Sequence, residues 1–388
     1  MTPRTRSLAL EAAVSGSLEE TSHGPVFVAC RRYPLHYRQG SIPLGAALDA
    51  SPEILSLLSR CRDMSPRPDQ LLYLDIETTG LAGGTGTYAF LVGAGFFEDG
   101  SFVVRQYFMR DLDEEPALLS ALHELLPRFE GWVTYNGRAF DLSLLETRFI
   151  LARRPWPSPL WHLDLLPAAR RVWASRLADC RLVTVEAHAL GLRREDDVPG
   201  SLIPALYFEY LRRRQTGALP KLFSHNRQDL LSLAALAGWV SRALSEPESL
   251  LLSAQEYVGL GRLWEPWSPE RGRQCYRTAL DQGLQGPERE WLLLRLADLA
   301  KRESRWEEAC TLWQAAITGT ADFRLRPWEE LAKYHEHKSR DLSTAFRVVA
   351  EALRLARARR AHPKVLEVLT HRQSRLTRRL SAPRASAA

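Results

Sequence analysis

The sequence predicts an α/β domain with a mixed sheet, followed by an all-α domain. Apolar runs of strand length follow residue 70 and then alternate with helical patterns, which is typical of an α/β sheet. After residue 246 the strand signal fades and helical patterns continue. The chain has 388 residues, of which 45% are hydrophobic and 25% charged, so it is long enough for two or three globular domains.

The first 70 residues form an extension that we expect to pack on the α/β domain. Residues 24–37 contain a short apolar run that predicts a strand. Residues 52–60 predict a short helix, because proline is favoured in the first turn of a helix. A proline-rich break at 65–68 then separates the extension from the next domain. The predicted domains are 1–70, 71–245 and 246–388.

Strands dominate the first part of the α/β domain. Glu98-Asp99-Gly100 predicts a hairpin turn between two of them. Two helices are predicted from apolar residues at helical spacing. The predicted strands are 71–76, 88–97, 102–109 and 132–135, and the predicted helices are 114–129 and 142–151.

Three segments of the helical domain resemble one another. They end at Leu280, Ile317 and Leu353, which are 37 and 36 residues apart. This period, with small residues inside an amphipathic helix, resembles tetratricopeptide repeats. An ordinary helical bundle with accidental self-similarity is the alternative. A repeat domain of this kind would recruit a protein partner or extend a path for nucleic acid, and its basic end slightly favours the second role.

The net charge of +6 is concentrated at the C-terminal end. Residues 340–388 hold 12 Lys or Arg and 3 Asp or Glu. Such an excess is either an electrostatic footprint for nucleic acid or the solvated face of a basic helix. Replacing the cluster Arg357, Arg359 and Arg360 would distinguish the two through the salt dependence of oligonucleotide binding.

The sequence favours a cytoplasmic protein without a membrane span. No apolar run reaches the roughly 18 to 20 residues that span a bilayer, and the N-terminus lacks the apolar core of a signal peptide. The 5 cysteines are scattered without Cys-x-x-Cys spacing, which indicates reduced thiols rather than a disulfide framework or a zinc site.

Two carboxylates stand at the end of the strand predicted at 71–76. Because side chains alternate along a strand, Asp75 and Glu77 share one face, opposite the apolar Leu72, Leu74 and Ile76. Two buried like charges without a partner are costly, and a divalent cation is the simplest compensation.

Two further acidic positions lie later in the domain. Asp141 opens the helix predicted at 142–151 and, considered alone, is best interpreted as its N-cap. His225 and Asp229 are four residues apart on a predicted helix and therefore share a face. Considered alone, such a pair is more often a surface hydrogen bond. The segment 195–197, Glu-Asp-Asp, is expected to be a solvated loop.

The glycine-rich stretch 80–86 does not predict a nucleotide cofactor. A dinucleotide fingerprint needs a helix after its glycines, whereas residues 88–97 form a predicted strand. A Gly-Lys-Ser/Thr P-loop is absent as well. We expect these glycines to let the backbone pass close to a metal site or to a substrate end.

Taken together, these positions resemble the DEDD superfamily of 3′-to-5′ exonucleases, which have a ribonuclease H-like fold, and more closely its YprB-like branch. The resemblance covers about 71–245. Histidine-type members of the superfamily usually place the histidine one residue further before the last aspartate than His225 stands here, a departure that fits the YprB-like pattern. The motifs that carry the resemblance are DIETTGLAGGTGTYAFLVGAGFF (75–97), YNGRAFD (135–141), HLDLLPAARRVW (162–173), DDVPGSLIP (196–204) and HNRQDLLSL (225–233).

The resemblance implies a nuclease that uses two Mg²⁺ or Mn²⁺ ions. Asp75 would bridge the ions, Glu77 and Asp229 would hold the first, and Asp141 would serve the second. His225 would orient or deprotonate the attacking water. Three further residues, Thr78, Asn136 and Phe140, are expected to contact the substrate. Asn136 could instead hold its turn, and Asp164 is either an acidic position beside the site or a cap.

The predicted activity is hydrolysis of DNA or RNA from the 3′ end. A non-catalytic scaffold that binds nucleic acid and protein is the alternative from a different class. A structure-specific endonuclease would use the same residues. The sequence does not distinguish DNA from RNA or terminal from internal cleavage.

Overall fold

The computed structural model describes residues 10–80, 84–318 and 322–381. It divides into two compact units, residues 1–272 and 273–388. This division falls later than the boundary expected at residue 246, because α9 (Ala254–Trp264) packs into the first unit. Trp173 Nε1, at the end of α5 (Leu165–Trp173), donates to Glu256 of α9 at 2.9 Å and ties that helix to the α/β domain.

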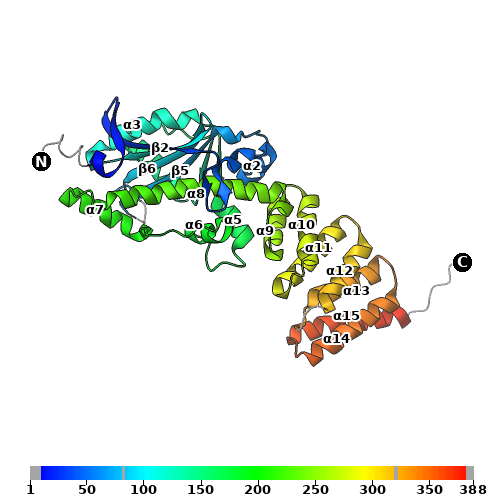
Figure 1. Ribbon diagram of the computed structural model, residues 1–388. Helices are drawn as coiled ribbons and strands as arrows, with labels where there is room; N and C mark the ends of the chain where they lie inside the picture. Colours follow the sequence, from blue (N-terminus) through cyan, green and yellow to red (C-terminus); the bar gives the residue numbers. More distant parts are fainter. Residues whose placement is uncertain (1–9, 81–83, 319–321, 382–388) are drawn as a thin grey trace. The chain divides into compact units, whose positions relative to one another are not determined.

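A seven-stranded mixed sheet forms the centre of the first unit (Figure 1). Its strand order is β1-β2-β7-β6-β5-β8-β9. The neighbours β5, β8 and β9 run parallel, and the other neighbours run antiparallel. The strands are β1 (Gly16–Thr21), β2 (Gly24–Pro34), β5 (Leu71–Thr78), β6 (Ala89–Glu98), β7 (Ser101–Phe108), β8 (Gly131–Thr134) and β9 (Trp161–Asp164); β3 (Arg38–Gln39) and β4 (Ile42–Pro43) pair separately.

The predicted mixed sheet is confirmed, and β5, β6, β7 and β8 lie close to their predicted bounds. The sequence pattern does not predict β1 or β9. The first has Leu18 as its one large apolar residue, and the second is only 4 residues long, so neither alternates for long enough to give a signal. Because β1 and β2 join the sheet, the segment before residue 71 is part of the α/β layer and not only a cover on it.

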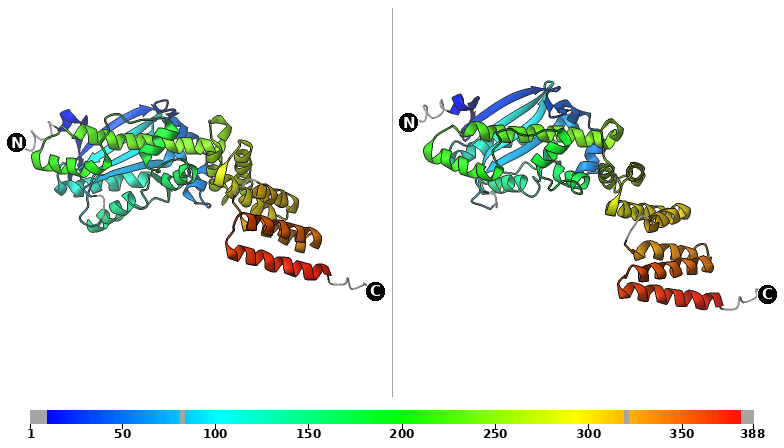
Figure 2. Two further views of the ribbon diagram at one scale, coloured as in Figure 1. Left: turned by 90° about the horizontal axis from the view of Figure 1, so that it is seen from below. Right: turned by 60° about the horizontal axis from the view of Figure 1, so that its bottom comes forward.

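Helices pack against the sheet, and the longest, α8, runs across β5, β6 and β7 (Figures 1 and 2). On β5, Leu72, Leu74 and Ile76 face away from α8 into the core that contains Leu118 and Leu122 of α3. The other helices of this unit frame the ends of the strands. In chain order they are α2 (Pro52–Ser59), α3 (Glu115–Leu125), α4 (Asp141–Leu151), α5, α6 (Leu182–Val185), α7 (Ile203–Arg213), α8 (Leu219–Ser245) and α9.

The second unit is all-helical in its described residues, as predicted. Consecutive helices from α11 to α15 pack on one another (Figure 2). The tetratricopeptide assignment itself stays a prediction. The helices are α11 (Gly286–Arg302), α12 (Trp306–Thr318), α13 (Leu325–His337), α14 (Leu342–Ala358) and α15 (Pro363–Ser381), while α10 (Pro269–Asp281) spans the division.

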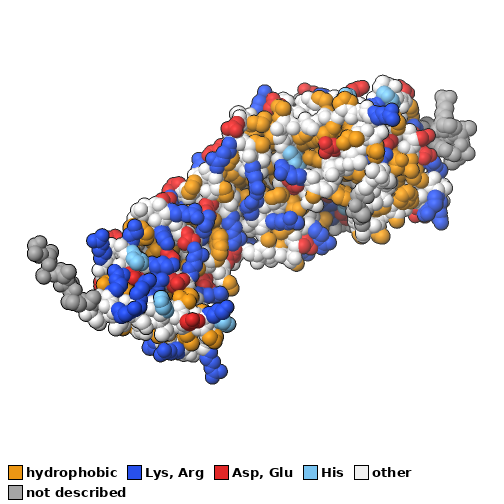
Figure 3. Space-filling model, turned by 180° about the vertical axis from the view of Figure 1, so that it is seen from behind, with side chains coloured by type: hydrophobic (Ala, Val, Ile, Leu, Met, Phe, Trp, Pro, Cys, Tyr) orange, Lys and Arg blue, Asp and Glu red, His pale blue; other side chains and the backbone are white. Residues whose placement is uncertain are grey.

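Lysine and arginine side chains gather over the second unit (Figure 3). Part of this charge holds the unit together. The buried carboxylate of Glu336 on α13 accepts hydrogen bonds from Arg375 and Arg379 of α15, both at 2.6 Å, and from Arg372 at 3.4 Å. Three arginines of the basic C-terminal end are therefore structural.

Within the described ranges, no helix combines the length and the hydropathy that a membrane span requires.

Candidate active site

The acidic residues of β5 face α8, as their alternation predicts. Asn226 of α8 donates from Nδ2 to the Asp75 carbonyl at 3.0 Å and to Asp75 Oδ2 at 2.8 Å. Glu77, two residues further along the strand, lies with Oε1 at 3.9 Å from His225 Nε2 of the same helix. The carboxyl end of β5 and the first half of α8 therefore form one wall of the site.

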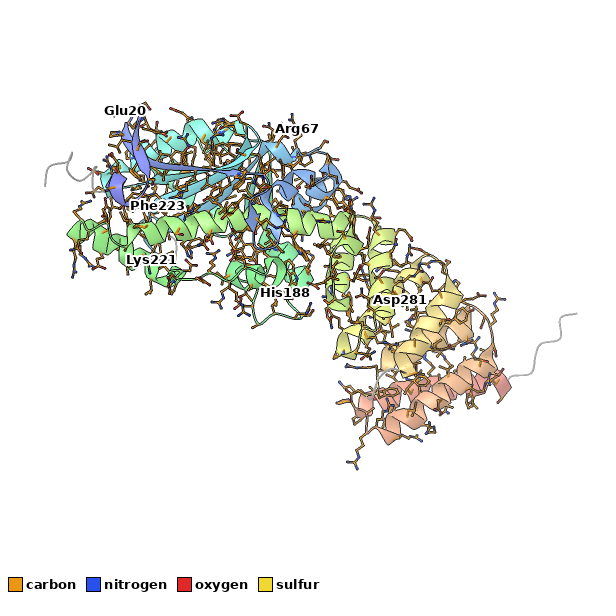
Figure 4. The ribbon with its side chains drawn as sticks, in the orientation of Figure 1. Glu20, Arg67, His188, Lys221, Phe223 and Asp281 are labelled. Carbon is orange, nitrogen blue, oxygen red and sulfur yellow. The ribbon has the colours of Figure 1, made fainter. Side chains whose placement is uncertain are left out.

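A buried amide pair fixes α8 against the sheet. Gln106 of β7 donates from Nε2 to Asn226 Oδ1 and to the carbonyl of Phe223, both at 2.8 Å. Phe223 is labelled on α8 in Figure 4. Gly93 on β6, opposite Asp75, makes room for this pair, because a Cβ atom there would lie 2.3 Å from Asn226 Oδ1. Asn226 is fully buried and satisfied by these bonds. It therefore sets where Asp75 stands.

Asp141 is not a helix N-cap. It is the first residue of α4, and its Oδ1 accepts a hydrogen bond from the Ile76 backbone N–H at 3.3 Å. The N-cap position is held by Phe140, which makes no side-chain cap bond. The carboxylate of Asp141 therefore turns to β5, where it joins Asp75 and Glu77 in an acidic group.

The turn before α4 is held by Asp164, at the end of β9. Its carboxylate accepts from the backbone N–H of Asn136 at 2.8 Å and of Arg138 at 3.4 Å, and it caps α5 through Leu166 N at 3.1 Å. Asn136 has a left-handed backbone with φ of 66°. Thr78 donates to the Gly80 carbonyl at 2.8 Å. The structure thus gives Asp164, Asn136 and Thr78 local structural bonds; contact of Thr78, Asn136 or Phe140 with a substrate remains a prediction.

His225 and Asp229, which share one face of α8, lie close to Glu77. His225 Nε2 lies 3.6 Å from Asp229 Oδ2. One ligand atom each from Glu77, His225 and Asp229 lie within 4.8 Å of one another, a spacing that a metal ion could bridge. On its other side, His225 Nδ1 is 2.7 Å from Asp197 Oδ1. Because an ionised carboxylate only accepts, Nδ1 carries the proton of a neutral ring and Nε2 is left as the acceptor.

Arg194 and Asp197 are site residues that sequence reasoning missed. The segment 195–197 was expected to be a solvated loop, yet its Asp197 side chain is only 17% exposed. Arg194, 3% exposed, pairs with the fully buried Glu186 at 2.5 Å, with Asp197 at 3.1 Å, and with Asp229. One guanidinium thus partly neutralises the acidic group from the side of this loop.

Burial and neighbouring charges shift the pKa values of the carboxyl groups in this site. Burial raises the pKa of Asp75 and Glu77 well above the usual carboxyl range, and the charges of Asp229 and Asp141 raise both further. Burial raises the pKa of Asp141 to about 7, although its backbone hydrogen bonds oppose the rise. At Asp197 burial acts in the same direction but is outweighed by the hydrogen bond from His225 and the charge of Arg194, so its pKa is lowered.

These residues fit a divalent cation of the hard, oxygen-preferring kind. Carboxylate oxygens dominate the set, which suits Mg²⁺ or Mn²⁺. The raised pKa values of Asp75, Glu77 and Asp141 indicate that the protein's own cations do not compensate the group. The chemistry of a nuclease centre is therefore available from these residues.

Comparison with known proteins identifies the class. A model of the RNase_H superfamily matches residues 72–241, which hold all five predicted catalytic residues: Asp75, Glu77, Asp141, His225 and Asp229. A relative, the uncharacterized protein YprB of Bacillus subtilis (strain 168), is 32% identical over 319 residues, which are 81% of this chain and 76% of the relative. The chain belongs to the YprB-like family of the RNase H superfamily.

Among solved structures, the family B DNA polymerase of the hyperthermophilic archaeon Pyrobaculum calidifontis overlaps 58% of this chain at 18% identity, with a TM-score of 0.36. The overlap spans 32% of the polymerase.

The protonation of Asp141 should make metal-free stability depend on pH. Its folded pKa is about 7, whereas an unfolded aspartate titrates near 3.9. The stability that the protonated carboxyl contributes is fully present below the unfolded pKa and is lost as the pH rises through about 7. The asparagine side chain of the Asp141→Asn variant cannot ionise. The free energy of unfolding of this variant, relative to that of the wild type, should therefore rise by about 2–4 kcal/mol between pH 4.5 and 7.5.

Urea unfolding in EDTA at the two pH values measures this difference. The control is Asp281→Asn, which removes an exposed carboxylate from the end of α10. A gap between Asp141→Asn and the wild type that does not change with pH would contradict the prediction.

Proposed function

We propose that this protein is a metal-dependent nuclease that removes nucleotides from the 3′ end of DNA or RNA. The observation that carries the proposal is the convergence of four carboxylates and a histidine, remote in sequence, at the carboxyl end of β5. The proposal assigns Asp75, Glu77 and Asp229 to a first Mg²⁺ or Mn²⁺ ion and Asp141 to a second. When bound, such ions supply positive charge that stabilises the attacking and leaving oxygens of phosphodiester hydrolysis.

The chain's own residues would orient and deprotonate water. The Asp197 carboxylate holds the Nδ1 proton of His225, as in other carboxylate–histidine pairs, so that Nε2 can accept a proton from the nucleophile. Nε2 faces Glu77 and Asp229, at 3.9 and 3.6 Å from their oxygens, and so lies beside the proposed metal ligands. Arg194 orients Asp197 and Asp229 together.

Cleavage of matched linear and circular substrates tests this proposal. Single-stranded DNA and RNA of one sequence, 5′-labelled when linear and internally labelled when circular, are incubated with Mg²⁺ or Mn²⁺ or with EDTA. We expect the linear strand to shorten from its 3′ end only when metal is present, and the circle to stay intact because it has no end. The preferred sugar follows from the relative rates on DNA and RNA.

Two outcomes would contradict the proposal. Cleavage of the circle as fast as of the linear strand would indicate an endonuclease that uses the same residues. No metal-dependent cleavage of either substrate would favour a scaffold that binds nucleic acid without hydrolysing it.

A further inference from the structure

A second feature of the first unit is a cavity of about 590 Å³. It lies between the end of α2, one side of α5 and the end of α9, with the turn after β8 and the strand β9 as a further wall. Five arginines line it, against the carboxylates of Asp63 and Asp164. The arginines are Arg60, Arg62, Arg138, Arg171 and Arg262.

Arginines outnumber carboxylates in the lining of this arginine cavity, five to two. Arg62 donates to the Pro266 carbonyl at 2.5 Å, and Arg171 donates to the Pro167 carbonyl at 3.3 Å, so both bond to neutral groups. Within the described ranges, neither these two nor Arg60 and Arg138 has an ion pair with a carboxylate.

Mutual repulsion is evident in the cavity. Burial lowers the pKa of Arg171, and the nearby charge of Arg60 lowers it further. Cations held together without counter-charges are costly unless an anion joins them. Guanidinium groups recognise phosphate through paired N–H donors, which makes a phosphate-bearing ligand the natural occupant.

The arginine cavity adjoins the acidic site. Asp164 lines the cavity, and its carboxylate accepts from the backbone N–H of Asn136 and Arg138, in the turn that leads to Asp141. Arg138, also in the lining, stands in the turn between β8 and Asp141. A chain of phosphates could therefore leave the acidic site along this turn and enter the cavity.

The cavity also offers an aromatic surface. Trp267 lines it, and the Arg62 guanidinium lies 4.6 Å from the centre of the indole ring. Indole and guanidinium planes are common stacking partners for bases in single strands. Arg60, Arg62, Arg262 and Trp267 all lie outside the residues 72–241 that match the superfamily, so the cavity is built largely by segments added to the common domain.

We propose that the arginine cavity binds the phosphodiester backbone of a single nucleic-acid strand, upstream of a 3′ end placed at the acidic site. The inference rests on the proposed function for the direction of the strand. A size of 590 Å³ is within the range of ligand pockets and suits a short stretch of a strand rather than a duplex.

The test is strand binding by the full chain in EDTA, where no hydrolysis interferes. The variant Arg60→Asn/Arg171→Ser removes two cavity charges, and Asn is chosen because Arg60 has a left-handed backbone with φ of 62°. The matched control is Arg153→Asn/Arg212→Ser. It removes a left-handed arginine, with φ of 54°, and an exposed helical arginine of α7, neither of which lines the cavity.

Fluorescence anisotropy of a labelled single-stranded oligonucleotide is followed over a range of KCl concentrations. We expect the cavity variant to bind about 10-fold more weakly than the control at low salt. Its plot of log K against log [KCl] should be shallower by about 1.4, because each lost phosphate contact removes about 0.7 from the slope. Circular dichroism and thermal melting verify that both variants are folded.

Equal affinity and slope for the cavity variant and the control would overturn the proposal. A second result would also overturn it: calorimetry shows that a nucleoside 5′-monophosphate needs Arg60 and Arg171 for binding, whereas a strand does not. The cavity would then hold a free nucleotide. Because no step requires cleavage, a protein that binds strands through the cavity but never hydrolyses them would refute the proposed nuclease. Strand binding by the cavity would then stand, without the assigned direction.

Discussion

Asp75→Asn should abolish metal-dependent cleavage while the fold remains intact. The charges of Asp229, Glu77 and Asp141 all act on this carboxylate, which makes it the centre of the acidic group. The asparagine oxygen can still accept the hydrogen bond that Asn226 donates at 2.8 Å, so the change removes charge with little change of shape. We expect kcat/KM to fall on the order of 10³-fold or more, the scale of losing a catalytic group.

Metal binding provides a readout that is independent of cleavage. Calorimetric titration with Mn²⁺ should show an affinity at least about 10-fold weaker for Asp75→Asn than for the wild type, because a carboxylate ligand is lost. The metal-free variant should also be more stable than the wild type, since a buried like charge has been removed. Asp281→Asn should match the wild type in all three measurements. Undiminished cleavage by Asp75→Asn would remove Asp75 from the mechanism.

The acidic residues could be predicted because their evidence is local. Alternation along β5 alone separates Asp75 and Glu77 from Leu72, Leu74 and Ile76, and it needs no knowledge of what packs above the strand. The helical spacing that brings His225 and Asp229 together is equally local. Such patterns survive in any tertiary setting.

Asp141 shows where local evidence fails. An aspartate directly before an apolar helix matches the N-cap pattern, and the sequence cannot show that Ile76, 65 residues earlier, presents a free backbone N–H to it. The division between the two compact units likewise depends on tertiary contacts that local patterns do not show. The helix α9 belongs to the first unit because it packs on α5, and the bond from Trp173 to the buried Glu256 is one of the contacts that hold it there.

Arg194 and Asp197 were missed because they lie in an irregular segment. Between Leu190 and Ile203 the chain forms one short helical turn and is otherwise irregular. The sequence therefore has no periodic pattern there that would separate buried from exposed side chains. The one available signal was the motif at 196–204, which belongs to the resemblance but carries no assigned role. Adjacent charged residues in such a loop look solvated until their buried partners are known.

Arg194→Met should destabilise the protein by about 3–5 kcal/mol, the cost of leaving a buried charge without its partner. The Arg194 guanidinium donates to both carboxylate oxygens of Glu186, at 2.5 and 2.8 Å, and Glu186 is fully buried. Burial alone would lower the pKa of Arg194, but the charges of Asp229 and Glu186 raise it, so the guanidinium keeps its charge at neutral pH. Methionine fills similar space and leaves Glu186 uncompensated.

A double-mutant cycle isolates the pair. Glu186→Gln should relieve much of the penalty in the Arg194→Met background, because the remaining group is then neutral and needs only ordinary hydrogen bonds. The comparison is Arg181→Met, which breaks the ion pair between Arg181 and Asp179. Because the Arg181 side chain is 82% exposed, this substitution should destabilise the protein by less than about 1 kcal/mol. Denaturant unfolding in EDTA gives all four free energies of the cycle. If the changes in unfolding free energy caused by Arg194→Met and Glu186→Gln simply add, the Arg194 guanidinium does not compensate Glu186. The position of Arg194 in the site would then be explained by Asp197 and Asp229 alone.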